Sequence, residues 1–449
     1  MITLLPKNLQ LNVLLILALF ATSNTIFSQN TTNIIDPNFE QALIDLGIDT
    51  NGFNGTILNT DAAMVTALNV FEKNISSLEG IEAFENLTYL SAYNNNIATL
   101  NLSANLQLEI VDVESNNLQT LNISQNANIK ELYVANNQLE VLEIGHLVGL
   151  ELLSCSLNNL TQLNVSQNTN LEVLWCYNNA LSTLDVTNNQ LLQTLACGDN
   201  YLDNLNVSQN HSLHTLMAPN NNLNAIAFNN HSVISYLDIS GNRFSELDLS
   251  ENNSLVRLFI ENNQISNLDL FHAPNLMLLF ASGNQLENLD VSLNTALRFV
   301  RLANNNLQTL DIRNNSNQTI SMFSTLGNTN LSCIMVDNVD ADYLLNWTID
   351  ANSNFVQSST ACNALSLNPS EENKTNLVVY PNPASNVINI KNLEANARIA
   401  LFNANGQLIK NNTTLMGSTQ IMVSDLASGL YILQIKTVTG TQSQKIIIK

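Results

Sequence analysis

The chain has 449 residues and a formal net charge of −22, with 37 Asp and Glu against 15 Lys and Arg. Nucleic acid is excluded as a partner, because duplex binding depends on clustered Lys and Arg and the sequence contains no basic stripe. Charged residues make up 12% of the chain, about half the usual ~25%, so its surface must be polar through amides and hydroxyls.

Residues 1–28 have the features of a secretory signal peptide. Lys7 precedes the apolar run Leu11–Ala21, and small and polar residues follow up to Ser28. A transmembrane helix is the alternative, but the apolar run is far shorter than the ~20 residues that cross a bilayer. We therefore expect a protein exported from the cytoplasm, in surroundings where disulfides persist.

Within residues 29–64, the segment Asp36–Asp49 predicts an amphipathic helix. Asp36 can serve as its N-cap, and Pro37 fits the first helical position. The apolar residues Phe39, Leu43 and Leu46 then follow at helical spacing.

A 21-residue repeat occupies residues 65–330. Around each repeated Asn the pattern is L-x-x-L-x-φ-x-x-N-x-L-x-x-L-x-φ, where φ is an apolar residue. A fixed period of this length predicts a solenoid. The repeated residues, which we expect to form a buried structural ladder, are Asn95, Asn116, Asn137, Asn158, Asn179, Asn200, Asn221, Asn242, Asn263, Asn284 and Asn305.

Each coil of this solenoid should contain one short strand. In Leu174-Trp175-Cys176 the alternation sends Leu174 and Cys176 inward and Trp175 outward. Stacked coils pair such strands in parallel. The Asn lies where the chain leaves the strand, and its amide can bond the backbone of the bend. The second half-coil is too short and too rich in Asn for an α-helix, so we expect extended or 3₁₀ backbone there.

The repeat resembles the leucine-rich repeat family, and the whole arrangement is similar to internalin-like bacterial surface proteins. The match runs from Val65 to Val336 and begins with a degenerate coil that has Lys73 in the Asn position. The resemblance implies an α/β-type repeat solenoid, an arc with one short parallel strand per 21-residue coil and little helix. Residues 29–64 are then the N-terminal helical cap that covers the end of the core.

Residues 331–362 depart from the repeat and predict a C-terminal cap. Cys333 and Cys362 bracket this segment, which in an exported protein predicts a disulfide between them. A metal site or redox relay is the alternative for the other cysteines, but no His falls at matching positions, so buried thiols are expected. These cysteines are 21 residues apart at the inward φ position: Cys155, Cys176 and Cys197.

Residues 363–375 predict a polar linker, and residues 376–449 predict a small antiparallel β-sandwich from alternating strand and turn signals. This module resembles the C-terminal sorting domain of the type IX secretion system of the Bacteroidota. The resemblance implies passage through the outer membrane, removal of the domain and often attachment to a surface glycolipid. A carbohydrate-binding sandwich is the alternative, but the module has no Trp. The motifs that carry the resemblance are Tyr380-Pro381-Asn382-Pro383, the NANGQ turn at 403–407, Leu426 with Gly429-Leu430-Tyr431, and the closing KIIIK at 445–449.

Function is expected on the outward side chains of the strands, which line the concave face. Aromatic residues exposed in a row are typical of surfaces that recognise proteins or sugar rings. The alternative is cross-strand stacking that only stabilises the sheet, by roughly 0.2–1 kcal/mol per pair. The predicted ligand-binding residues are Tyr89, Tyr93, Tyr133, Trp175, Tyr177, Tyr236, Arg257, Phe259, Phe280, Phe299 and Arg301, among the acids Asp112, Glu114, Glu131, Asp238 and Glu261.

Three functions remain open. The first is a secreted recognition or adhesion protein of the cell surface that binds a protein or polysaccharide ligand. The second is a polysaccharide-degrading enzyme on a parallel β-helix, although each coil shows only one strong alternation. The third is a structural surface spacer without a ligand. The sequence has no nucleophile-elbow, zinc-protease or phosphate-loop motif, so we expect no enzymatic activity, no cofactor and no metal. The expected partners are the concave-face ligand and the type IX secretion machinery.

Overall fold

The computed structural model describes residues 30–227, 233–366, 378–393, 397–403, 406–413, 417–437 and 440–449. Residues 1–28, predicted as the signal peptide, lie outside the described residues. The chain divides into two compact units at Leu365 and Ser366, and each is described by itself.

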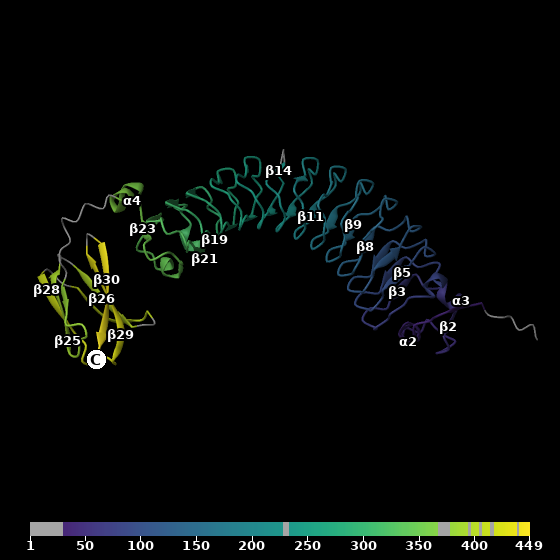
Figure 1. The fold of residues 1–449 in the computed structure, drawn as a ribbon, viewed down its shortest axis with the longest axis horizontal. Coiled ribbons are helices and arrows are strands. Elements are labelled where there is room, and N and C mark those ends of the chain that lie inside the picture. Colours follow the sequence, from purple (N-terminus) through teal and green to yellow (C-terminus); the bar gives the residue numbers. More distant parts are fainter. Residues whose placement is uncertain are drawn as a thin grey trace, which may run out of the picture. The chain divides into compact units, whose positions relative to one another are not determined.

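The first unit is a solenoid whose coils stack in an arc (Figure 1). One strand from each coil joins a 13-stranded parallel sheet on the inner, concave side. The prediction of one short parallel strand per coil is confirmed. These strands are β3 (Ala67–Asn69), β4 (Tyr89–Ser91), β6 (Ile110–Asp112), β8 (Glu131–Tyr133), β9 (Leu152–Ser154), β10 (Val173–Trp175), β11 (Thr194–Ala196), β13 (Thr215–Met217), β15 (Tyr236–Asp238), β16 (Arg257–Phe259), β17 (Leu278–Phe280), β19 (Phe299–Arg301) and β21 (Met322–Ser324).

The register of this sheet follows from the repeat. Leu174 of β10 pairs with Leu153 of β9 and Leu195 of β11, each one period away. Coil-to-coil backbone hydrogen bonds such as Cys155 N to Trp175 O, 2.8 Å, extend the ladder beyond the strands. No coil could satisfy its own strand, so stability depends on stacking.

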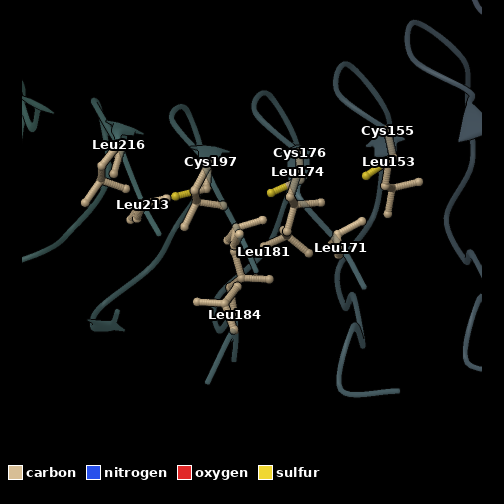
Figure 2. Close-up of a cluster of buried hydrophobic side chains, with 14 of the residues drawn as sticks. Leu153, Cys155, Leu171, Leu174, Cys176, Leu181, Leu184, Cys197, Leu213 and Leu216 are labelled. Atoms are coloured by element: carbon tan, nitrogen blue, oxygen red, sulfur yellow. The ribbon is translucent and has the colours of Figure 1, made fainter. Parts of the chain in front are cut away.

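The interior is one continuous apolar core from Ile34 to Trp347. Figure 2 shows how a single coil fills it, with leucines from both half-coils directed into the same interior. Leu171, Leu174 and Leu181 are fully buried. The three repeated cysteines lie in successive coils beside these leucines, and burial raises the pKa of the Cys155 and Cys197 thiols to about 12. They are buried neutral thiols, as predicted.

The second half-coils are turns and short extended segments, without α-helix among the described residues of the repeat. Some of them pair into small parallel sheets with their neighbours, a regularity that their Asn-rich sequence did not reveal. These strands are β5 (Thr99–Asn101) with β7 (Thr120–Asn122), β12 (Leu205–Asn206) with β14 (Ile226–Ala227), and β18 (Asn288–Asp290), β20 (Thr309–Asp311), β22 (Cys333–Met335) and β23 (Asn354–Val356). The 3₁₀ helices are η1 (Ile81–Ala83), η2 (Asn317–Thr319) and η3 (Asp342–Asn346).

The N-terminal end of the core is covered by α2 (Pro37–Asp45). Asp36 caps this helix, since its Oδ1 accepts the N–H groups of Asn38 and Phe39 at 2.8 and 3.2 Å. Its Oδ2 accepts the N–H of Ser76 at 2.6 Å, so one carboxylate also fixes the helix to the first coil. Around α2 lie the antiparallel pair β1 (Thr31–Asn33) and β2 (Thr56–Leu58), and α3 (Asn59–Ala62).

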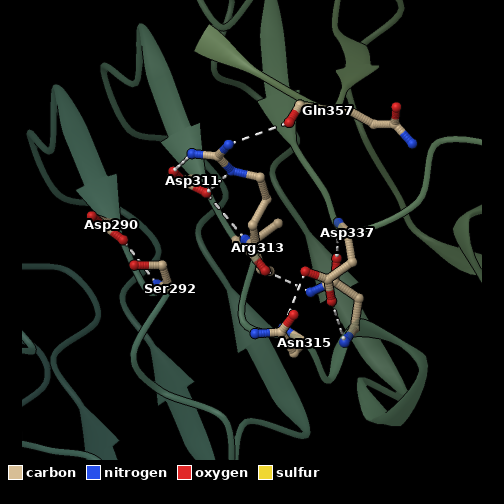
Figure 3. Close-up of polar contacts among 9 residues, drawn as sticks. Asp290, Ser292, Asp311, Arg313, Asn315, Asp337 and Gln357 are labelled. Carbon is tan, nitrogen blue, oxygen red and sulfur yellow. Dashed lines mark hydrogen bonds and ion pairs between the residues drawn. The ribbon is translucent and has the colours of Figure 1, made fainter.

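The C-terminal end is closed by β23, α4 (Ser359–Ser366) and the disulfide Cys333–Cys362, which confirms the predicted pairing. The helix extends four residues into the segment that we expected to be a linker; residues 367–375 lie outside the described residues. Figure 3 shows a polar connection to the last coils. Arg313 pairs with Asp311 and donates to the carbonyl of Gln357 at 3.2 Å. Asp337 accepts the N–H groups of Asn315 and Asn317.

The second unit is an antiparallel β-sandwich with its own core, as predicted. Asn382 of the Tyr-Pro-Asn-Pro motif clamps the last strand, donating to Lys445 O at 2.7 Å and accepting from Ile447 N at 2.8 Å. Its two sheets have the orders β24-β25-β28 and β27-β26-β29-β30, with bounds β24 (Val378–Tyr380), β25 (Val387–Leu393), β28 (Gly417–Met422), β27 (Leu408–Thr413), β26 (Arg398–Asn403), β29 (Gly429–Thr437) and β30 (Gly440–Ile448).

Candidate functional site: the concave face

The concave face presents three outward positions per coil, which lie six, four and two residues before the ladder Asn. Because the strands are in register, each position forms a column across the sheet. The predicted ligand-binding residues are all in these columns: Tyr89, Tyr236, Arg257 and Phe299 in the first, Tyr133, Trp175, Phe259, Phe280 and Arg301 in the second, and Tyr93 and Tyr177 in the third. The structure does not bring them into one site but into separate groups along the arc.

The first group is acidic. We call Glu72, Asp112, Glu114 and Glu131 the acidic region. Tyr133 donates to Glu131 at 2.8 Å, and Ser154 donates to Glu114 at 2.5 Å across two coils. Burial raises the pKa of the Asp112 carboxyl, while burial and Glu131 raise the pKa of Tyr133 to about 12.

Aromatic rings also stack within this part of the face. The rings of Phe71 and Tyr93 lie 5.0 Å apart and nearly parallel. The Tyr93 hydroxyl is 3.5 Å from Glu72. Tyr89, two columns away from Tyr93, is half-buried. In this region cross-strand stacking and hydrogen bonding engage Tyr93 and Tyr133.

The second group is Trp175 with Tyr177, the central pair. In register, Trp175 has Ser154 on one side and Ala196 on the other. Tyr177 has Ser156 and Gly198 at the corresponding positions of the neighbouring coils, and it is 37% exposed. Two large rings therefore stand in a stretch of sheet that is otherwise lined by small residues.

The third group spans four coils, and we call it the arginine–aromatic cluster: Tyr236, Arg257, Phe259, Phe280, Phe299 and Arg301. The Phe259 ring lies 5.3 Å from Tyr236 and 5.3 Å, edge to face, from Phe280. The Arg301 guanidinium lies 4.3 Å from the Phe280 ring centre, within the range of a cation–π contact. The more distant Arg257 guanidinium lies 6.0 Å from the Tyr236 ring.

Two acids border this cluster. Asp238 accepts the N–H of Ser240 at 3.0 Å, and burial raises the pKa of its carboxyl. Burial also raises the pKa of Glu261, an effect that nearby Arg301 opposes. The cluster thus combines apolar rings, two guanidinium groups and two partly desolvated carboxyls.

The asparagine ladder lies where each coil leaves the concave strand, and its amides bond the backbone of neighbouring coils. Asn158 Nδ2 donates to Val134 O at 3.0 Å and Cys155 O at 3.2 Å, while its Oδ1 accepts Leu139 N at 2.9 Å. Ten of the eleven predicted asparagines are buried, and Asn179 is partly exposed. Asn328 fills the same role in the last coil, donating to Leu302 O and Thr325 O; the sequence analysis missed it because the period there lengthens.

A second ladder, which the sequence analysis also missed, runs through the other half-coils. Each amide donates to carbonyls of the preceding coil, as Asn126 does to Leu102 O at 2.9 Å and Asn105 O at 2.8 Å. The signal was an Asn two residues after Ser or Thr, recurring with the period but interrupted at Leu147, His231 and Ala273. The members of this second ladder include Asn105, Asn126, Asn168, Asn189, Asn210 and Asn294.

Two further searches concern metals and membranes. Over the part of the chain that the structure describes, no group of three or more His, Cys, Asp and Glu is arranged to hold a metal ion. Among the same residues, no helix combines the length and the apolar character needed to span a membrane.

Comparison with known proteins places both units. The protein-family model described as "Secretion system C-terminal sorting domain" matches residues 378–449. The second unit is therefore a sorting domain that directs export by type IX secretion to the cell surface or extracellular space. No curated protein sequence matches the chain.

Two solved structures from Listeria monocytogenes resemble the chain. One is the functional domain of InlJ, which includes a cysteine ladder, with a TM-score of 0.62, 22% identity, and coverage of 95% of this chain and 100% of that one. The other is the internalin InlF, with a TM-score of 0.60, 19% identity, and coverage of 74% and 99%. These likenesses show a leucine-rich repeat fold of the internalin kind. Fold and sorting domain together define an exported leucine-rich repeat protein.

Proposed function

We propose that this exported protein recognises a ligand, a protein or a polysaccharide, through its concave face and acts at the cell surface in recognition or adhesion. In this proposal residues 1–28 start export as a signal peptide and residues 376–449 engage the type IX secretion machinery. The predicted concave-face residues supply the contact surface.

The observation that carries the proposal is the setting of the central pair. Cross-strand stacking explains Phe71 with Tyr93, but Trp175 has only Ser154 and Ala196 as its register partners. A large ring beside such small neighbours gains little cross-strand contact. Trp175 is half-buried and Tyr177 is exposed, and aromatic side chains that present part of their surface in this way are typical of the centres of recognition surfaces.

The two alternatives differ in how they fit the fold. A parallel β-helix enzyme does not fit, because the structural relatives are leucine-rich repeat proteins and the long sheet lies on one side only. A spacer without a ligand would use the same fold but would be indifferent to the residues of the central pair. A substitution at that pair therefore separates recognition from spacing.

The experiment applies the full-length protein to an array of polysaccharides and extracellular-matrix proteins. The test variant is Trp175→Ala/Tyr177→Ala, and the matched control is Tyr201→Ala/Phe271→Ala, which removes two exposed aromatic residues outside the three concave columns. We expect the test variant to lose binding by at least about tenfold, as for a recognition hot spot, and the control to bind like the parent. Equal binding by parent and test variant, or no binding by the parent, would reject the proposal.

A further inference from the structure

The arginine–aromatic cluster has the composition of a protein-binding centre. From β15 to β21, the residues in the first column are Tyr, Arg, Leu, Phe and Met, one from each strand. Those in the second column are Asp, Phe, Phe, Arg and Ser. Aromatic residues, Met and Arg are the types enriched at the centres of protein–protein interfaces. Phe299 is 37% exposed and Met322 38% exposed, so apolar surface is available to a partner.

The ring geometry favours a protein over a sugar chain. Phe259 and Phe280 meet edge to face, at 87°, so they do not form one flat platform for a sugar ring. Phenylalanine also offers no hydrogen-bonding group to sugar hydroxyls. An apolar side chain of a protein, in contrast, gains from contact with both rings.

The charges point to carboxylates on that protein. Among the residues that the structure describes, Arg257 and Arg301 have no hydrogen-bonded oxygen or ion-pair partner, and both are exposed. The Arg301 Nε donates to the Met322 sulfur at 3.3 Å. A guanidinium held against an aromatic ring presents a fixed fork that fits a carboxylate.

The distribution of charge along the solenoid supports this assignment. Residues 30–227 contain 20 Asp and Glu and two basic residues, Lys73 and Lys130, whereas residues 233–366 contain 13 Asp and Glu and five arginines. Lys130 and Arg313 are paired with carboxylates of the chain itself. Net negative charge is therefore denser in the segment before the cluster, so an acidic partner is repelled less strongly at the cluster, where the two guanidinium groups attract its carboxylates.

We propose that the arginine–aromatic cluster binds a protein segment in which an apolar side chain is flanked by carboxylates. This inference rests on the proposed concave-face recognition and assigns it a place and a partner chemistry. Glu261 lies in the third column of the same face, two residues before Asn263, and the charge of Arg301 acts on its carboxyl, so we expect it to compete with the incoming carboxylate.

The test uses the full-length protein and two synthetic peptide libraries of equal length with a central Phe or Leu. Asp and Glu flank the central residue in one library, and Lys and Arg flank it in the other. We expect the acidic-flanked peptides to bind, more weakly as salt rises. Arg257→Gln/Arg301→Gln should weaken binding at least about tenfold, Glu261→Gln should strengthen it, and Arg257→Glu/Arg301→Glu should shift preference to the basic-flanked library. Thermal melting followed by circular dichroism checks that each variant folds.

The outcomes separate this inference from the proposed function. Equal binding of both libraries, or unchanged binding by Arg257→Gln/Arg301→Gln, overturns the inference. If neither library binds while an array ligand is lost in Trp175→Ala/Tyr177→Ala, recognition by the concave face stands and the inference is overturned. If neither library binds and no array ligand depends on the central pair, both fail.

Discussion

Asn158 shows what a single side chain does in this solenoid. Its amide forms hydrogen bonds in two coils: it accepts the N–H of Leu139 and donates to Val134 O and Cys155 O. Each of these backbone groups is buried, and an unsatisfied buried group costs ~1–3 kcal/mol.

Asn158→Ala should therefore lower the free energy of unfolding by roughly 1–3 kcal/mol, because Leu139 N loses its acceptor. Val134 O and Cys155 O each lose one of two amide donors and keep the bond from the neighbouring ladder Asn. Urea denaturation followed by far-ultraviolet circular dichroism measures the change. Asn159→Ala is the control, since Asn159 is exposed and only its backbone bonds the preceding coil. An equal effect of the two substitutions would contradict the assigned role.

Leu157 is in a conformation that suits another residue type. The position before each ladder Asn is left-handed, and most coils place Asn or Gly there, but Leu157 has φ +55°. A Cβ in this conformation costs ~1–2 kcal/mol, and Asn tolerates it best among non-glycine residues. Leu157→Asn should raise the free energy of unfolding by about 1 kcal/mol in the same assay. Leu191→Asn, another exposed leucine but without positive φ, should give no gain.

At the scale of the element, the fold was largely predictable because the same pattern of apolar residues and Asn recurs in every coil. The strand register, the ladder, the Asp36 cap and the Cys333–Cys362 bond each depend on residues at fixed spacing. The extension of α4 to Ser366 was not predictable, since a short polar sequence of this kind favours neither a helix nor an irregular linker. The grouping of the concave residues was also hidden, because spacing assigns a column but not the angle between two rings or the reach of Glu114 to Ser154.

The C-terminal cap offers an element-scale prediction. The disulfide joins β22 to α4 across a sequence separation of 29 residues. Closing a loop of this size stabilises a fold by about 3–4 kcal/mol. Cys333→Ala/Cys362→Ala should thus speed amide hydrogen exchange in β23 and α4 by at least tenfold, while β10 and β11 exchange as in the parent, since distant coils interact only through their neighbours. Uniform acceleration along the solenoid would refute the local role.

At the scale of the molecule, the net charge of −22 opposes folding at neutral pH. Burial adds to this at Asp112, Asp238 and Glu261, whose raised pKa values mean that the folded state prefers the protonated carboxyl. Each such group stabilises the folded state most when it is protonated, at pH values below its ordinary pKa near 4. This stabilisation is lost as the pH rises through the raised pKa of the folded state.

We therefore expect the melting temperature to rise as pH falls from 7.5 to 5, by roughly 2–4 °C. Asp112→Asn should raise the melting temperature at pH 7.5 and reduce its gain on acidification. Asp185→Asn is the control of opposite sign, because hydrogen bonds from Thr187 lower the pKa of Asp185. Calorimetry at a series of pH values measures all three proteins, and a parent that is most stable at pH 7.5 would contradict the argument.

The uniform register has a consequence for how such a chain can change over generations. Ala180 N bonds Leu160 O as Asn159 N bonds Leu139 O, so deletion of residues 159–179, which include the central pair, rejoins the chain with this backbone contact between coils replaced by its equivalent. Recombination between repeats can thus shorten or lengthen the arc in steps of one coil. Each step moves the acidic region nearer to the arginine–aromatic cluster or farther from it by one strand spacing, about 4.8 Å. The number of repeats between them thus sets the distance from the acidic region to the arginine–aromatic cluster without changing the residues of either.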